Sequence, residues 1–146
     1  MRVDDIMTDE VATVDLRSSV ADCARTMLRE GAGSVVVTAD GGPAGIVTES
    51  DALRAGVASG KPLSAVPTRA VMSSPIKWVR PDSTARAAAK KMREKRVKKL
   101  VVVVDSSEMV GIVTATDIAF HLSDVARDVG QMIELKDKWE SDRRFR

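Results

Sequence analysis

The sequence predicts an α/β (α+β) fold made of two copies of one β-α-β-β-α unit, followed by a C-terminal helix. The first observation is that Gly45-Ile46-Val47-Thr48-Glu49-Ser50-Asp51 recurs as Gly111-Ile112-Val113-Thr114-Ala115-Thr116-Asp117. The second is that earlier segments match at an offset of 65 residues, as in Ile6-Met7-Thr8 and Val71-Met72-Ser73, whereas the motif matches at 66. The extra residue falls in a turn, where insertions do not disturb packing. A duplication explains both observations.

In the first copy, strands are recognised by β-branched runs and helices by apolar residues three and four apart. The predicted strands are Val11–Val14, Ser34–Thr38 and Ala44–Thr48. A helix is expected after the capping residues Asp15–Ser19, with Val20, Ala24, Met27 and Leu28 on its apolar face, and Gly31 ends it. A second helix follows from Asp51. Because Ser34–Thr38 shows no polar alternation, both of its faces should be covered.

The second copy repeats this order. Its predicted strands are Ile76–Val79, Leu100–Val104 and Val110–Thr114, and its helices are expected along Ala85, Ala88, Ala89 and Met92 and from Asp117. The stretch Gly56–Thr68 contains Gly60, Pro62 and Pro67 and is interpreted as a short connector, so the copies should pack together and share a core. The predicted division is copy one with its connector (1–65), copy two (66–122) and a tail (123–146).

The tail is expected to form an appended amphipathic helix, although Gly130 interrupts it at a cost of about 1 kcal/mol relative to Ala. Its apolar residues with helical spacing are Val125, Val129, Met132, Ile133 and Trp139. Two roles stay open for Trp139 and Phe145, namely packing on their own domain and contact within a homodimer.

Composition excludes several classes of protein. With 146 residues, 44% hydrophobic and 30% charged, the chain suits one globular domain with a soluble surface. No apolar run reaches the roughly 20 residues of a membrane span, and no apolar leader opens the chain. The single Cys23 fits a reducing cytoplasm, and with the single His121 it argues against a metal site. Because no catalytic motif is found, we do not expect an enzyme.

Charge is distributed unequally. Residues 1–70 hold 7 Lys/Arg against 10 Asp/Glu, whereas residues 71–146 hold 16 against 11. Eight basic residues lie between Arg86 and Lys99, interrupted only by Glu94. This basic face at 86–99 raises nucleic-acid binding as an alternative, which would depend strongly on salt. Interleaved aromatic residues are missing, however, so a solvated helix face is the preferred interpretation.

The two strand-to-helix junctions carry the candidate chemistry. Thr48 and Asp51 stand where a strand meets a helix, and Thr114 and Asp117 repeat the arrangement. A helix N-terminus exposes N–H groups that favour an anion, while a carboxylate can accept hydrogen bonds from a ribose diol. This set of groups suits a nucleotide. Thr-x-x-Asp is also an ordinary helix-capping arrangement, and for a single copy capping is the favoured interpretation.

The repeated unit resembles a CBS domain, and the pair resembles a CBS-domain pair, or Bateman module. The resemblance rests on the openings Ile6-Met7-Thr8 and Val71-Met72-Ser73, the element order and the two Gly-Ile-Val-Thr-x-x-Asp endings, over about residues 1–122. It implies a disc-like module with pseudo-two-fold symmetry and two clefts between the copies. Each cleft would take AMP, ADP or ATP, or in some members S-adenosylmethionine or NAD.

The resemblance also implies residue roles. Asp51 and Asp117 would bind the ribose, and Thr48 and Thr114 would contact the phosphate side. Lys98 and Lys99 would neutralise phosphate, although a solvated helix end explains them equally well; copy one has uncharged Gly33 and Ser34 there. Trp78 either stacks on adenine or lies in the core or at its rim. The residues expected to hold adenine are Ile46, Ile112, Val11 and Ile76.

The predicted function is a stand-alone regulatory module that signals by conformational change. It requires no cofactor, and an adenine nucleotide, AMP first among them, is its regulatory ligand. By resemblance we expect a homodimer and a further effector protein. The alternatives are nucleic-acid binding through the basic face and a dimerisation scaffold without ligand.

Overall fold

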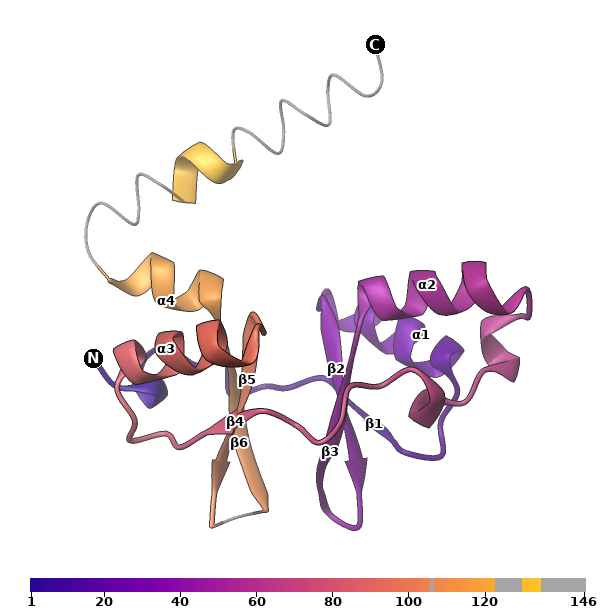
Figure 1. Ribbon diagram of the computed structural model, residues 1–146, viewed down its shortest axis with the longest axis horizontal. Coiled ribbons are helices and arrows are strands. Elements are labelled where there is room, and N and C mark those ends of the chain that lie inside the picture. The colour runs from indigo at the N-terminus through magenta and orange to yellow at the C-terminus, as the bar shows by residue number, and fades with distance from the viewer. Residues whose placement is uncertain (106, 123–129, 135–146) are drawn as a thin grey trace.

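The computed structural model describes residues 1–105, 107–122 and 130–134. It contains two three-stranded sheets whose inner faces meet at the centre of the molecule, with the helices on the outside and at one end (Figure 1). Each sheet has its strands in chain order, the first pair parallel and the second antiparallel. The predicted tandem β-α-β-β-α fold is confirmed.

Copy one consists of β1 (Thr13–Asp15), α1 (Val20–Glu30), β2 (Ser34–Ala39), β3 (Gly42–Thr48) and α2 (Glu49–Ser59). Helix α1 begins with a capping box between Ser19 and Asp22 and ends at Gly31, whose φ of 62° is the left-handed conformation that glycine adopts without strain. The hairpin between β2 and β3 turns through Asp40 and Gly41, both with positive φ. Such turns match the twist of the paired strands.

Copy two consists of β4 (Trp78–Val79), α3 (Ala85–Lys95), β5 (Lys99–Val104), β6 (Glu108–Thr114) and α4 (Ala115–His121). Thr84 caps α3 by accepting a hydrogen bond from the Ala87 N–H at 3.0 Å. The two hairpin turns lie at one end of the paired sheets, and the strand-to-helix junctions lie at the other (Figure 1).

Strand β2 is covered on both faces, as predicted. Val35 and Val37 are fully buried against α1 and α2, while Val36 faces the other sheet. Strand β5 divides in the same way, because Val101 and Val103 join Val36 in a small cluster between the sheets. Each copy also has a larger cluster of its own. The expected shared core is therefore real, but it is the smallest of the three.

The opening segments, Ile6-Met7-Thr8 and Val71-Met72-Ser73, each pack on the other copy. Val3 and Ile6 are buried in the core of copy two, and Val66 is buried in the core of copy one, with Val71 and Met72 against it. The chain division at residue 65 thus separates the sequence repeats, while packing crosses that division. This interleaving ties the copies together without a large shared core.

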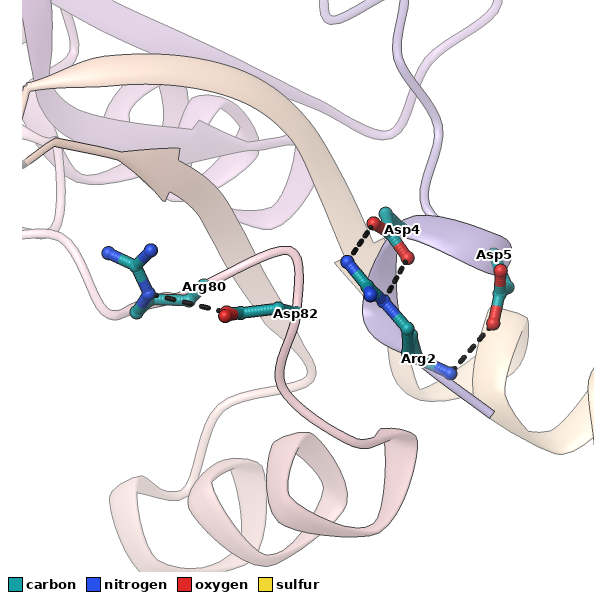
Figure 2. A network of polar contacts seen from close by, with 5 residues as sticks. All are labelled: Arg2, Asp4, Asp5, Arg80 and Asp82. Carbon is teal, nitrogen blue, oxygen red and sulfur yellow. Dashed lines mark hydrogen bonds and ion pairs between the residues drawn. The ribbon is translucent and has the colours of Figure 1, made fainter.

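The N-terminal residues are held against the start of α3. The Val3 N–H donates to the Ser83 carbonyl at 2.8 Å, and the Ala85 N–H donates to the Met1 carbonyl at 2.9 Å. Figure 2 shows the side chains around this contact. Arg2 pairs with Asp4 at 2.8 Å, and its backbone N–H donates to Asp5. The pair with Asp4 raises the pKa of the Arg2 guanidinium. Because these ion pairs are exposed, the backbone hydrogen bonds hold the segment more firmly.

The same figure shows Arg80 beside Asp82 in the loop that receives the N-terminal residues, at 3.3 Å. An antiparallel backbone bridge between Arg2 and Thr84 joins the N-terminal segment to the end of this loop, just before α3. In copy one, an equivalent bridge between Ser19 and Pro67 joins the residue before α1 to the segment that opens copy two. Each sandwich of sheet and helices therefore closes with backbone from the other repeat.

Several local predictions were wrong. Helix α2 continues to Ser59, so the first four residues of the expected connector are helical, and the rest contains two short 3-10 helices, Leu63–Ala65 and Thr68–Ala70. Leu28 is 84% exposed, because Cys23 and Thr26 take the buried face of α1 instead. Ala89 of α3 is also exposed.

The expected C-terminal helix is described only in part. Residues 130–134 are helical, and Gly130 lies against Phe120, where a Cβ would be 2.5 Å from the ring. The glycine that weakens the helical pattern therefore permits a close contact with α4. Met132 and Ile133 are exposed. Val125, Val129, Trp139 and Phe145 lie outside the described residues.

Candidate ligand-binding site

Both junctions are helix caps. Asp51 Oδ2 accepts a hydrogen bond from the Thr48 N–H at 2.9 Å, and Thr48 Oγ1 accepts one from the Asp51 N–H at 3.2 Å. Thr114 and Asp117 repeat this with 2.9 and 3.1 Å. The capping interpretation is therefore confirmed for both copies. It does not exclude a ligand, because a carboxylate oxygen has two lone-pair directions and each carboxylate has two oxygens.

The junctions differ at the other carboxylate oxygen. Asp51 Oδ1 accepts a hydrogen bond from the Arg54 guanidinium at 3.2 Å. The residue three positions after Asp117 is Phe120, which has no such donor. Both aspartates are half-buried, whereas the Arg54 side chain is 76% exposed. The first junction thus carries an exposed arginine that is not duplicated at the second.

Lys98 and Lys99 differ in how far their side chains are buried. Lys98 is exposed, and its carbonyl accepts a hydrogen bond from the Ala115 N–H at 2.9 Å. Lys99 is half-buried and pairs with Thr114 across β5 and β6. Its Nζ reaches copy one, where it lies 3.5 Å from the position that a Cβ on Gly33 would take. Of the two lysines expected by resemblance to neutralise phosphate, Lys99 is thus the one whose ammonium extends toward copy one.

The electrostatics around Lys99 combine opposing effects. Burial lowers the pKa of the Lys99 ammonium, while the nearby carboxylates of Glu49 and Asp117 act to raise it. Glu49 belongs to copy one and Asp117 to copy two. Lys99 thus lies between the two junctions. Sequence reasoning missed Glu49 and Gly33 as neighbours of this lysine, because they are distant in the chain.

The four residues expected to hold adenine lie along the seam between the sheets. Ile46, Ile112, Val11 and Ile76 are all half-buried and pack against the shared cluster of Val36, Val101 and Val103.

Backbone bridges show which of these residues approach each other. Ile46 exchanges two hydrogen bonds with Ser73, at 3.1 and 2.9 Å, three residues before Ile76. Ile112 exchanges two with Thr8, both at 2.9 Å, three residues before Val11. The strand that leads into each junction is therefore paired with the opening segment of the other copy. Sequence reasoning found the openings only as repeat markers, and missed Thr8 and Ser73 as neighbours of the site.

A cleft of about 360 Å³ lies at the hairpin end of the molecule. Residues of both hairpins and of the approach to β4 line it, among them Asp40, Pro43, Pro75, Trp78 and Ser107, and Ile76 is the predicted site residue that contributes to it. Trp78 is 45% exposed, and the Lys91 Nζ lies 4.8 Å from its ring centroid. Trp78 thus lies at the rim of this cleft. The interpretation of a rim tryptophan agrees with this position.

Within residues 1–105, 107–122 and 130–134, no three His, Cys, Asp or Glu side chains gather as a metal site would require. Among these same residues, no helix has the length and apolar character needed to cross a bilayer.

Comparison with known proteins agrees with the geometry. The CBS-domain family model matches residues 3–58 and again residues 69–124. An uncharacterized protein of Methanopyrus kandleri, MK0525, is 33% identical over 117 residues, which cover 80% of this chain and 60% of that protein. The chain therefore spans less than two thirds of that relative.

Solved structures show the same fold. The CBS domain protein TA0289 of Thermoplasma acidophilum, of unknown function, has a TM-score of 0.75 and 31% identity, covering 86% of this chain and 71% of that one. The CBS domain pair of protein MJ0100, solved in complex with 5′-methylthioadenosine and S-adenosyl-L-methionine, has a TM-score of 0.75 and 23% identity, covering 84% and 100%. Two matches to one family model in tandem, on this fold, establish that the chain belongs to the CBS-domain family and carries a pair of its domains.

Proposed function

We propose that this chain is a regulatory module that binds an adenosine-containing ligand between its two CBS domains, with AMP as the first candidate. One observation supports this most directly: the strand that leads into each strand-to-helix junction is paired with the opening segment of the other copy, through Ile46 and Ser73 and through Ile112 and Thr8. A ligand that extends from a junction along its strand would therefore lie beside both copies. CBS domains are typically regulatory units and not enzymes, so the proposal includes no catalytic role.

The chemistry of the junctions fits a nucleoside. Asp51 and Asp117 each stabilise their helix through one oxygen and have further lone pairs for the hydroxyls of a ribose. The half-buried isoleucines of the seam provide an apolar surface for a base, and Lys99 provides a cation for an anionic group. The fold accommodates such molecules in MJ0100, which was solved with two adenosine-containing ligands.

Signalling would follow from the interleaved packing. The copies meet through a small apolar cluster and through the opening segments. A ligand that binds one arrangement of the copies more tightly shifts the population toward that arrangement. The direction of the change and the effector protein that senses it are further parts of the proposal.

Calorimetric titration with AMP, ADP, ATP and S-adenosylmethionine tests the proposal. We expect saturable heat and a rise in melting temperature with at least one ligand, because a ligand that binds only the folded state stabilises it. If none of the four produces heat or a thermal shift, the sensor function is wrong and a ligand-free scaffold becomes the better description.

We also propose a homodimer in the cytoplasm. Helix α2 exposes Leu53 and Val57, 71% and 86% accessible, and these residues are four apart and so lie on one face. Leu28 of α1 is exposed as well. A second chain that covers these residues would remove apolar area from water. The buried and unpaired Cys23 is compatible with a reducing compartment.

The nucleic-acid alternative stays a prediction. Helix α3 exposes Arg86, Lys90, Arg93 and Lys95, and Lys91 is close to Trp78. A mobility-shift assay at low and high salt separates this alternative from the sensor, because binding through phosphate contacts weakens steeply with salt.

A further inference from the structure

The charges at the two junctions are split between the copies. The Glu49 N–H donates to the Gly33 carbonyl at 3.2 Å, and the Ala115 N–H donates to the Lys98 carbonyl at 2.9 Å. These equivalent contacts align Glu49 with Ala115 and Gly33 with Lys98, and therefore Ser34 with Lys99. Copy one supplies an acid where copy two has alanine, and copy two supplies a lysine where copy one has serine.

This acid and this lysine approach the same point. The position that a Cβ on Gly33 would take is 3.5 Å from Lys99 Nζ and 4.0 Å from Glu49 Oε1. Gly33 has no side chain, so the space above it is available to both groups. Burial lowers the pKa of Lys99 and Glu49 acts against that effect, which agrees with an interaction between the two charges.

We infer that Glu49 is a built-in competitor for Lys99, which an anionic group of the ligand must displace, so that this pair selects ligands by their charge. The inference deepens the proposed function and rests on it. In the free protein the carboxylates of Glu49 and Asp117 both act to raise the pKa of the half-buried Lys99 ammonium, and Glu49 has the larger effect of the two. A bound phosphate takes over that role and meets repulsion from Glu49, which is exposed and able to turn outward. The repulsion grows with the number of phosphate charges.

The predicted selectivity is specific. Adenosine carries no charge, so its affinity should not depend on Glu49. The carboxylate of Glu49 should weaken the binding of AMP, ADP and ATP by an amount that increases in that order. Lys99 attracts the same series. The class of ligand favoured by the pair is therefore an adenosine derivative with a small anionic group, in preference to a triphosphate.

Isothermal titration of the full chain with adenosine, AMP, ADP and ATP tests this. In Glu49→Gln we expect the affinity for AMP to rise about five-fold and that for ATP to rise more, while adenosine is unchanged, because one repulsive charge has been removed. Lys99→Met keeps the buried stem and should lower the affinity for the nucleotides alone. In the double variant Glu49→Gln/Lys99→Met, the increase in nucleotide affinity caused by Glu49→Gln should be smaller than in the parent, because the charges of Glu49 and Lys99 act on one another.

Glu108→Gln is the matched control. It removes one exposed carboxylate from the start of β6, at the hairpin end of the molecule. One outcome is that adenosine and AMP still bind while Glu49→Gln changes nucleotide affinity no more than Glu108→Gln does. In that case the inferred competition by Glu49 is wrong, whereas the proposed ligand-binding function stands. If no ligand binds the parent or Glu49→Gln, both are wrong. Binding of nucleotides only after Glu49→Gln supports competition by this carboxylate.

Discussion

Gly45 lies directly against Met72. A Cβ at Gly45 would be 2.8 Å from Met72 Sδ and 2.9 Å from the Ser73 carbonyl oxygen. In the same way, a Cβ at Gly111 would be 2.7 Å from Met7 Sδ. The glycine that begins each Gly-Ile-Val-Thr motif is therefore required because the opening segment of the other copy crosses over it. The two most evident repeat markers are thus in contact across the copies.

Gly45→Ala and Gly111→Ala should each destabilise the protein by about 1–3 kcal/mol, because the new methyl group meets a backbone carbonyl that cannot turn aside. Urea denaturation measures the loss. Gly56→Ala is the control: its Cβ would be 3.4 Å from the flexible Leu63 side chain, and alanine favours the helix. Equal stabilities for Gly45→Ala and Gly56→Ala would show that the opening segment of copy two can move away from Gly45 at little cost.

Asp117→Asn should reduce adenosine affinity about ten-fold or more, because the charged acceptor of two ribose hydrogen bonds is lost. The amide oxygen can still accept the Thr114 N–H, so much of the helix cap remains. Asp22→Asn is the matched control, since Asp22 forms the same capping box with Ser19 in α1. Calorimetry should show normal binding in the control. Equal losses in both variants would assign the effect to helix capping.

Lys99→Met should change how stability depends on pH. Burial lowers the pKa of Lys99 from its ordinary 10.5, so folding disfavours the charged form. The parent is therefore penalised below the folded pKa and gains stability as pH rises through that value toward 10.5. Lys99→Met lacks the penalty, so its melting temperature should rise less than the parent's as the pH is raised toward 10.5. Parallel melting curves would contradict this assignment.

Cys23 should be inert in the folded protein. Its side chain is fully buried, its Sγ lies 3.3 Å from Thr68 Oγ1, and burial raises the pKa of the thiol. A thiol reagent should react with it only as fast as the protein opens, and promptly in denaturant. Rapid reaction of the native chain would show that the contact between α1 and the segment at Thr68 opens readily.

Thr68→Val should destabilise the protein by about 1 kcal/mol, because the hydrogen-bonding partner of Cys23 is lost within a buried site. Urea denaturation measures this change. Thr84→Val offers no useful comparison, since Thr84 caps α3. Thr116→Val in α4 is a better control, because Thr116 is exposed.

Substituting Leu53 and Val57 together by Glu should convert the proposed homodimer to a monomer, because two charges would be buried against apolar groups. Sedimentation equilibrium gives the mass directly. The double substitution should leave the melting curve of the monomer unchanged, since both side chains are exposed in the single chain. An unchanged mass in the variant would place the interface elsewhere, and a monomeric parent would exclude the dimer.

Local patterns in the sequence predicted the elements well where the signal was local. The run Val35-Val36-Val37 indicated a strand covered on both faces, and the structure buries all three residues completely. The Thr-x-x-Asp spacing favoured helix caps at Thr48 and Thr114 and left a ligand site open as well, and the structure shows both caps. Leu28 was predicted on the buried face of α1 because it is apolar and has helical spacing. In the structure, the smaller side chains of Cys23 and Thr26 occupy that face instead.

The sequence by itself determined the duplication, because whole segments recur 65 or 66 residues apart. It also determined the order of the strands and helices and the two Thr-x-x-Asp junctions, because these depend on residues a few positions apart. Only the tertiary structure decided that each opening segment packs on the other copy and that Lys99 of copy two lies beside Gly33 and near Glu49 of copy one. Contacts of this kind join residues from 27 positions apart, as in Gly45 and Met72, to 104 positions apart, as in Gly111 and Met7. They are fixed by how two sheets meet, and no local periodicity records them.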